Sequence, residues 1–336
     1  MGRSGRIRIA RLIVVASVTI SGFFLSATLT RVYLEADDLS WKTTIDELEG
    51  IILDSDEENV VGEADLQIIV AIVACTKSKD DWKSVETTAL HNILIPSIER
   101  TVTPSEKKHV RVDLVVGFDD NDPFWNDPEN RKKLQASTHV PISFISVPKQ
   151  PSRPYRIPFN EVCRASYEYG ADFIARVNDD SEFITPGWIT KGVNRLSHYN
   201  PPWVGVVGPT CRQGNTQILT HDFVHRTHMD IFENYYPDEF DNWWIDDWIT
   251  YVYGPKRTTR LPDWEMFHHT SKHGQRYQVE QSLKRQLPLS LRRGAQQIEL
   301  FVQQNESQVL LHQRTVLGTD RLAGVWGPIA DFVASH

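Results

Sequence analysis

The sequence has no surplus of basic residues. Its 36 Lys and Arg residues are outnumbered by 44 Asp and Glu residues, which gives a formal net charge of -8 at pH 7. Proteins that bind nucleic acid generally need an excess of Lys and Arg along the phosphate backbone. The charge balance therefore argues against a general nucleic-acid binder, and we expect no nucleic-acid partner.

Cysteine is scarce as well. The chain contains three cysteines, Cys75, Cys163 and Cys211, which cannot all pair with one another. Two of them fall inside apolar segments with regular spacing, as buried thiols commonly do. We therefore expect mostly buried thiols, with one disulfide possible.

Charged residues are absent from one stretch near the N-terminus, residues 12–29, which reads LIVVASVTISGFFLSATL. At about 1.5 Å per residue, a helix of this length just crosses the roughly 30 Å hydrocarbon core of a bilayer. Arg11 and Arg31 flank the stretch, and arginines before an apolar span keep the N-terminus in the cytoplasm. The pattern predicts an uncleaved signal anchor of a single-pass type II membrane protein, with a cleaved signal peptide as the alternative.

The remaining composition is ordinary for a globular protein, with 336 residues, 40% of them hydrophobic and 24% charged. That length suits one large α/β domain with accessory segments, or two smaller domains. We expect residues 1–11 to form a cytoplasmic tail and the acidic residues 30–65 to form a solvated stem. A folded domain over 66–277 and a helical extension over 278–336 complete the predicted organisation.

Strand and helix patterns alternate through the folded domain. Apolar runs typical of buried strands are followed by segments with helical spacing. The order predicts an α/β fold, with a mainly parallel sheet, right-handed crossovers and flanking helices. We expect Pro96 to end the first helix and Gly170 to cap the second. The predicted strands are 67–75, 110–118, 142–147, 173–177, 203–208 and 218–226, and the predicted helices are 82–94, 159–167 and 188–196.

Acidic side chains follow two of these strands. One group is 178–182 (NDDSE) and the other is 119–122 (DDND). The carboxyl ends of parallel strands form the edge where open α/β sheets bind ligands. Carboxylates this close repel one another unless a cation lies among them, and Mg²⁺ or Mn²⁺ suits such oxygen ligands. The alternative is an acidic turn that is merely solvated.

A later stretch, 243–249 (WWIDDWI), places two aspartates among three tryptophans. Desolvation beside large apolar rings raises the basicity of a carboxylate, which suits a general base. The alternative is a helix N-terminus, where the helix dipole favours aspartate. Residues 266–273 bring three histidines close together in sequence. They either contact a metal or a diphosphate, or lie on the surface.

In this order the motifs resemble those of the GT-A fold glycosyltransferases. Residues 178–180 (NDD) look like the DxD or EDD metal motif. Asp246 and Asp247 look like the later acidic pair, whose second member is the base in inverting enzymes. The sequence is also similar to a poorly characterised GT-A-like set with the patterns GYDxxDPFW, DDxEFxTPGW, FVxRTHMEIF and WxDDW. These patterns correspond to 117–125, 179–188, 223–232 and 244–248, within a resemblance that spans about 66–277.

The resemblance implies a Rossmann-like nucleotide-diphospho-sugar transferase fold. It also implies transfer of a hexosyl or N-acetylhexosaminyl group from a nucleotide-sugar donor to a glycan or protein acceptor, with Mn²⁺ or Mg²⁺ as cofactor. Asp247 would be the catalytic base. Asp246 stands where the family usually has Glu, which leaves open which of the two aspartates acts.

The resemblance also implies a set of ligand-binding residues. Asn178 stands where many members have an acid, so the metal would rest on Asp180, assisted by Asp179 or Glu182, with His269 as a further ligand. The residues implied for donor binding are Thr76, Asp119, Asp120, Asp179, Arg226 and Lys272.

Two rival functions fit the same residues. A glycoside hydrolase could use Asp180 and Asp247 as acid and base without a metal. A membrane-tethered carbohydrate-binding module could stack sugars on exposed tryptophans. With the anchor, the resemblance implies a Golgi or endoplasmic reticulum membrane protein whose catalytic domain is lumenal.

Overall fold

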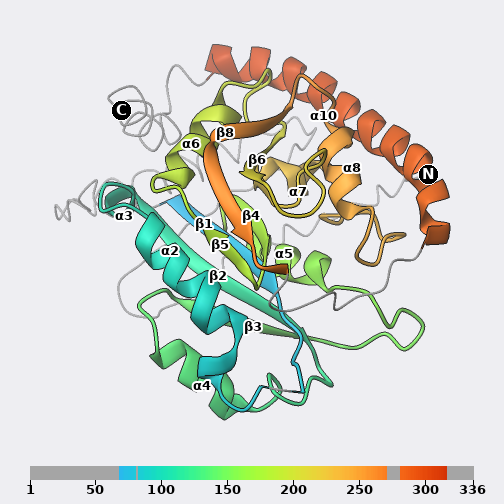
Figure 1. Cartoon of the computed structure of the whole chain (residues 1–336). Helices are drawn as coiled ribbons and strands as arrows, with labels where there is room; N and C mark the ends of the chain where they lie inside the picture. The colour runs from blue at the N-terminus through green and yellow to red at the C-terminus, as the bar shows by residue number, and fades with distance from the viewer. Residues whose placement is uncertain (1–67, 81, 271–280, 316–336) are drawn as a thin grey trace, which may run out of the picture. The chain divides into compact units, whose positions relative to one another are not determined.

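The structure is a computed structural model that describes residues 68–80, 82–270 and 281–315 (Figure 1). These residues all belong to one compact unit of the chain. Among them, no helix combines the length and the apolar character that a membrane crossing requires. The predicted tail, anchor and stem, residues 1–65, lie outside the described residues, and so does Lys272.

One eight-stranded sheet organises this part of the chain, with the strand order β3-β2-β1-β4-β7-β6-β8-β5. Its first four strands are parallel neighbours. They match the predicted strands closely, because β1 is a continuous apolar run of the kind buried inside parallel sheets, and β2 and β4 are mostly apolar. The bounds are β1 (Ile68–Cys75), β2 (Val110–Asp119), β3 (Ile142–Val147) and β4 (Phe173–Asn178).

The second half of the sheet is mixed. β4 pairs antiparallel with β7, β7 with β6, and β8 with β5, whereas β6 and β8 are parallel. The short connection 212–221 joins β6 to β7, and a parallel pairing would need a crossover of about a dozen residues or more. The mainly parallel sheet is therefore confirmed in the first half only. The bounds are β5 (Ser181–Phe183), β6 (Val206–Cys211), β7 (Asp222–His225) and β8 (Thr258–His268).

Pro96 and Pro262 lie where the structure differs from the predicted elements. Pro96 does not end a helix but lies in the first turn of α2 (Ile95–Thr101), where its missing N–H costs no hydrogen bond. The segment before it forms a 3₁₀ turn, η1 (Val85–Thr87), and a π turn, η2 (Leu90–Leu94), rather than one α-helix. β8 has no counterpart among the predicted strands, since a proline inside a run argues against a strand. Pro262 lies where the pairing of β8 with β6 changes register.

Other local predictions are confirmed. Gly170 follows α5 with φ +100°, the left-handed conformation expected of a helix cap. All three cysteines are buried and free. The further helices are α3 (Glu106–His109), α4 (Pro128–Ala136), α5 (Phe159–Glu168), α6 (Trp188–Ser197), α7 (Thr227–Ile231), α8 (Ile245–Val252), η3 (Gln281–Gln286) and α10 (Leu287–Thr315).

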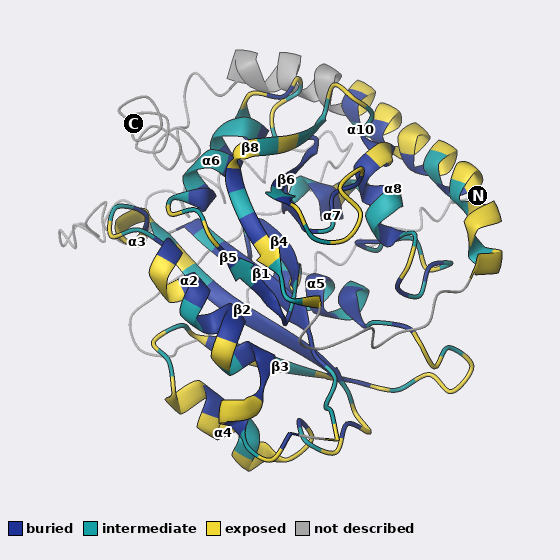
Figure 2. Cartoon of the chain, viewed as in Figure 1, coloured by how far each residue is buried: buried dark blue, intermediate teal, exposed yellow. Residues whose placement is uncertain are grey.

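Hydrophobic residues bury the centre of the sheet from both sides (Figure 2). Ile72 of β1 belongs to a cluster that includes α2 and α6, and the adjacent Val73 belongs to a second cluster that includes α5, α8 and α10. Burying one such side chain fully contributes about 1.5–3 kcal/mol. The two cores therefore fix the ends of β1 and β4, and also the start of α8.

Candidate active site

A cleft of about 540 Å³ lies at the carboxyl ends of β1 and β4. Cys75 ends β1, Asn178 ends β4 and Asp180 follows β4 directly, so all three lie at this edge of the sheet. Asp246 and Asp247, in the first turn of α8, line the same cleft. The structure thus brings together acidic residues that are almost seventy positions apart in the chain, as a shared ligand site requires.

Asp180 lies beside a histidine that strand pairing places there. Ser181 of β5 pairs with His268 of β8, and His268 Nε2 lies 3.0 Å from Asp180 Oδ1. The same ring nitrogen lies 3.2 Å from Asn178 Nδ2. All three side chains line the cleft.

The structure does not bring together the predicted metal ligands Asp180, Glu182 and His269. His269 Nε2 lies 2.7 Å from Glu182 Oε2, and Arg100 also pairs with Glu182 at 2.9 Å. Neither Glu182 nor His269 lines the cleft. His268, the last residue of β8, lies beside the Asp180 carboxylate, whereas the side chain of His269, just after β8, lies beside Glu182.

A divalent metal ion fits Asp180 and His268 if the substrate supplies further ligands. Across the described residues, no three His, Cys, Asp or Glu side chains are grouped closely enough to hold an ion by themselves. Mg²⁺ and related ions are often bound by one or two carboxylates together with substrate phosphates. A carboxylate and an imidazole, 3.0 Å apart at the cleft, can both ligate Mn²⁺.

Asp246 is held by a buried arginine that the sequence patterns did not single out. Arg176 of β4 is only 1% exposed, and its Nη2 donates to Asp246 Oδ1 at 2.6 Å and to Asp222 Oδ2 at 2.7 Å. Tyr236 donates to the same Asp222 oxygen at 2.7 Å. The sequence did contain a signal for this role of Arg176. An arginine inside an apolar strand is expected to be buried, and a buried arginine needs acidic partners.

Burial and neighbouring charges act in opposite directions on the pKa values of Arg176 and Asp246. Burial by itself would lower the pKa of Arg176, but Asp222, Tyr236 and Asp246 raise it overall. Burial raises the pKa of Asp246 to about 6, although Arg176 acts in the opposite direction. The Asp246 side chain is still 30% exposed toward the cleft. Arg176 therefore stays charged and anchors the first turn of α8.

Asp247 has a different environment from Asp246. Burial raises its pKa, while its own backbone N–H and Lys284 act to lower it. No other described residue makes a hydrogen bond or ion pair with its carboxylate. Of the two aspartates, Asp247 is therefore the one that is available to take a proton from a ligand.

Several residues predicted to bind the donor have structural partners. Thr76 Oγ1 donates to Asp179 Oδ2 at 2.7 Å, and both residues are buried where β1 and β4 end. Asp119 accepts from Lys149 Nζ at 2.7 Å, and Asp120 accepts from the backbone N–H of Lys149 at 3.0 Å. None of these four predicted residues lines the cleft.

Arg226 lies at the opposite edge of the sheet from Asp180. Because β7 runs antiparallel to β4, Arg226 comes beside Asp172 at the amino end of β4, and its N–H donates to the Asp172 carbonyl at 2.8 Å. Its guanidinium lies over the ring of Tyr167, 4.9 Å from the centroid. The predicted role of Arg226 in donor binding therefore has no geometric support.

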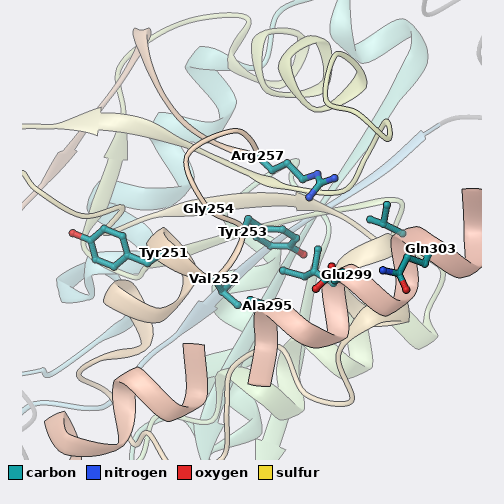
Figure 3. Close-up of a pocket in the computed structure, with 10 residues that line it drawn as sticks. Tyr251, Val252, Tyr253, Gly254, Arg257, Ala295, Glu299 and Gln303 are labelled. Atoms are coloured by element: carbon teal, nitrogen blue, oxygen red, sulfur yellow. The ribbon is translucent and has the colours of Figure 1, made fainter. Parts of the chain in front are cut away.

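A second cavity, of about 510 Å³, lies between the end of α8 and α10 (Figure 3). Tyr251, Tyr253 and Arg257 line one side, and Glu299 and Gln303 of α10 line the other. Its described lining has one carboxylate, that of Glu299, whereas the cleft at the end of β4 has three. We therefore assign the candidate active site to that cleft.

A scan against protein-family models finds no match, and a search of curated proteins also finds none. Among solved structures, the fold is similar to that of TarS 1-349 from S. aureus, with 12% identity, a TM-score of 0.40 and coverage of 61% of each chain. The match thus spans under two thirds of that protein's chain.

A second similar structure is the mannosyltransferase PcManGT from Pyrobaculum calidifontis, solved in complex with GDP-Man and Mn²⁺. It is 11% identical, with a TM-score of 0.45, over 87% of this chain and 92% of that one. A cytidylyltransferase from Leptospira borgpetersenii is 11% identical, with a TM-score of 0.36, over 58% of this chain and 76% of that one. We therefore base the functional inference on the residues of the cleft.

Proposed function

We propose that the chain is a metal-dependent glycosyltransferase that moves a sugar from a nucleotide-sugar donor to an acceptor hydroxyl with inversion. The observation that carries this proposal is the shared cleft, which is lined both by Asp180, just after β4, and by Asp247 of α8. Asp180, beside His268, would serve a metal, and Asp247 would accept a proton. A single sugar-transfer site needs both.

The charge of the cleft supports a role for a metal. Three aspartates line it, Asp180, Asp246 and Asp247, and its described lining includes no Lys or Arg. A diphosphate in this setting is repelled by three carboxylates, and an accompanying cation offsets that repulsion. Asp180 and His268 would hold Mn²⁺ or Mg²⁺, which stabilises the negative charge that develops on the leaving diphosphate.

In this proposal Asp247 acts as the catalytic base, and Asp246 helps to position it. Asp247 takes the proton of the acceptor hydroxyl as that oxygen bonds to the anomeric carbon. The bond from that carbon to the diphosphate breaks on the opposite face, so the configuration inverts. Arg176 fixes Asp246 and with it the first turn of α8. That pairing positions Asp247 without neutralising it.

A turnover assay of the full-length chain tests the proposal. Release of UDP or GDP is measured from a panel of nucleotide sugars with Mn²⁺, after addition of EDTA, and after Mn²⁺ is restored. We expect turnover that EDTA removes and Mn²⁺ restores, and that Asp247→Asn abolishes. Asp263→Asn, which changes an exposed aspartate outside the cleft, is the matched control. Turnover that survives in both EDTA and Asp247→Asn would overturn the proposal.

A glycoside hydrolase is the second candidate, and the same cleft favours it. Two carboxylates from different elements line a site whose described residues include no Lys or Arg, which also suits a neutral glycan between an acid and a base. A hydrolase of this kind needs no metal. Release of reducing sugar that is unaffected by EDTA, with no affinity for nucleotide, would favour it over the transferase.

We also propose that residues 12–29 anchor the chain in a Golgi or endoplasmic reticulum membrane, with the site on the lumenal side. The uncharged stretch between Arg11 and Arg31 supports this proposal. Protease protection of microsomes that contain the full-length chain is the test. Residues 66–277 should be protected until detergent is added, and N-terminal sequencing distinguishes an anchor from a cleaved signal peptide.

A further inference from the structure

An exposed indole lines the cleft next to the proposed base. Trp243 is 45% exposed, and of the exposed large hydrophobic side chains in the described residues it is the only one in the cleft lining. It lies four positions before Asp247. Ligand sites commonly combine such an aromatic surface with a few placed polar groups.

The backbone around Trp243 is held in one arrangement. Trp244 has φ +73°, a left-handed conformation that bulky residues rarely adopt and that tends to mark functional sites. The preceding segment is tied to the 148–158 loop, because Asn242 Nδ2 donates to the Tyr155 carbonyl at 2.8 Å and Ile157 N–H donates to the Asp241 carbonyl at 2.8 Å. The backbone that carries the Trp243 indole is therefore held in place by hydrogen bonds on one side of the cleft.

Neutral amides from the β6–β7 connection line the same cleft. Gln213 Oε1 accepts from the backbone N–H of His268, and Asn215 Oδ1 accepts from the backbone N–H of Gln217. The amide nitrogens of Gln213 and Asn215 have no partner among the described residues. They are donors that a ligand hydroxyl can use.

We propose that the acceptor is a neutral glycan, with one pyranose ring stacked by its C–H face on Trp243 and its hydroxyls bonded to Gln213 and Asn215. A serine or threonine hydroxyl of a protein has no apolar ring face to cover the indole. An anionic acceptor would meet three aspartates and, within the described lining, no Lys or Arg. The role of this glycan as an acceptor rests on the proposed transferase function, whereas binding of the glycan in the cleft does not.

Saccharide binding to the full-length chain tests this inference. Maltotriose, cellotriose and N-acetylchitotriose are the probes, and saturation-transfer NMR reports which of them binds. Trp243→Ala should weaken binding of that probe about tenfold, which is the scale of one lost aromatic contact. Trp243→Phe should restore most of the affinity. Tyr251→Ala, which removes an exposed ring outside the cleft, is the matched control.

Kinetics add a readout that a merely structural role would not change. In a transfer assay, Trp243→Ala should raise the KM for the trisaccharide more than it lowers kcat. Failure of all three probes to bind, or equal binding by wild type and Trp243→Ala, would overturn the inference even if nucleotide sugars turn over. Saccharide binding that depends on Trp243 without any nucleotide-sugar turnover would uphold it and reject the transferase function.

Discussion

The carboxyl ends of β2 and β4 carry acidic clusters that look alike in the sequence and differ in the structure. At the end of β2, Asp122 accepts backbone N–H bonds from Ser78, Phe124 and Trp125 at 2.7, 3.0 and 2.9 Å. At the end of β4, Asp180 faces a cleft. An acidic cluster is therefore structural where backbone donors occupy it, and it is a candidate site where it borders open space.

The same contrast separates neighbouring residues within the site. Asp246 is fixed by Arg176, whereas Asp247 has no ion pair among the described residues. Both are aspartates in the first turn of α8. Their partners alone distinguish an anchoring carboxylate from a reactive one.

Replacing the unpaired aspartate should have the largest effect on activity. Asp247→Asn keeps the shape but removes the base, so kcat should fall about 10²- to 10⁴-fold. The thermal unfolding midpoint should stay near that of wild type, because no described ion pair is lost. Steady-state turnover and a melting curve of the same preparation measure both. Full turnover in the variant would remove Asp247 from the mechanism.

Breaking the anchor should have the largest effect on stability. Arg176→Met leaves Asp222 buried without its cation, and losing one partner of a buried ion pair costs about 3–5 kcal/mol. Urea denaturation measures the free energy of unfolding. Arg212→Met, which breaks an exposed pair with Glu265, should cost less than about 1 kcal/mol. Equal losses in the two variants would contradict the anchoring role.

Replacing the structural aspartate should reverse the pattern seen for Asp247. Asp122→Ala leaves the backbone N–H groups of Ser78 and Trp125 without their acceptor, which costs about 1–3 kcal/mol. Turnover per folded molecule should not change. A large loss of kcat with unchanged stability would mean that the end of β2 belongs to the site.

The pH dependence should show the smallest effect. Burial raises the pKa of Asp247, and it raises that of Asp246 to about 6. Both groups act as carboxylates, so activity is lost as the pH falls through their raised pKa values. kcat/KM should drop about tenfold from pH 7 to pH 5 for a group with a pKa near 6. A profile that stays flat down to pH 4 would contradict raised basicity.

The raised pKa of Asp246 has the opposite effect on stability. The pKa of its carboxyl is the ordinary 3.8 in the unfolded chain and about 6 in the folded chain. The stabilising contribution of the protonated form is therefore present below about pH 4 and is lost as the pH rises to about 6. Asp246→Asn should flatten the stability curve over that range.

Local sequence patterns predicted the parallel half of the sheet and the helix that precedes Gly170. β1, β2 and β4 are long apolar runs, and Gly170 caps a helix of regular spacing. The other half depends on contacts between distant residues. β8, with Pro262 inside it, forms only because β6 and β5 pair with it.

The candidate site shows the same division. Asp180 and the pair Asp246–Asp247 could be identified from motifs, because each lies in a short acidic stretch of the sequence. The choice of His268 over His269 depends on the register of β8 against β5. The role of Arg176 depends on where α8 begins. Neither the register nor the docking of α8 can be derived from spacing alone.

The most direct test of the central claim is calorimetric titration of the full-length chain with UDP and GDP, with Mn²⁺ and with EDTA, in wild type and Asp180→Ala. If Asp180 holds a metal-bound diphosphate in the cleft, one nucleotide binds wild type only when Mn²⁺ is present. Asp180→Ala then loses that binding, while Asp122→Ala keeps it. Nucleotide binding that is equally tight in EDTA, or in Asp180→Ala, would contradict the account.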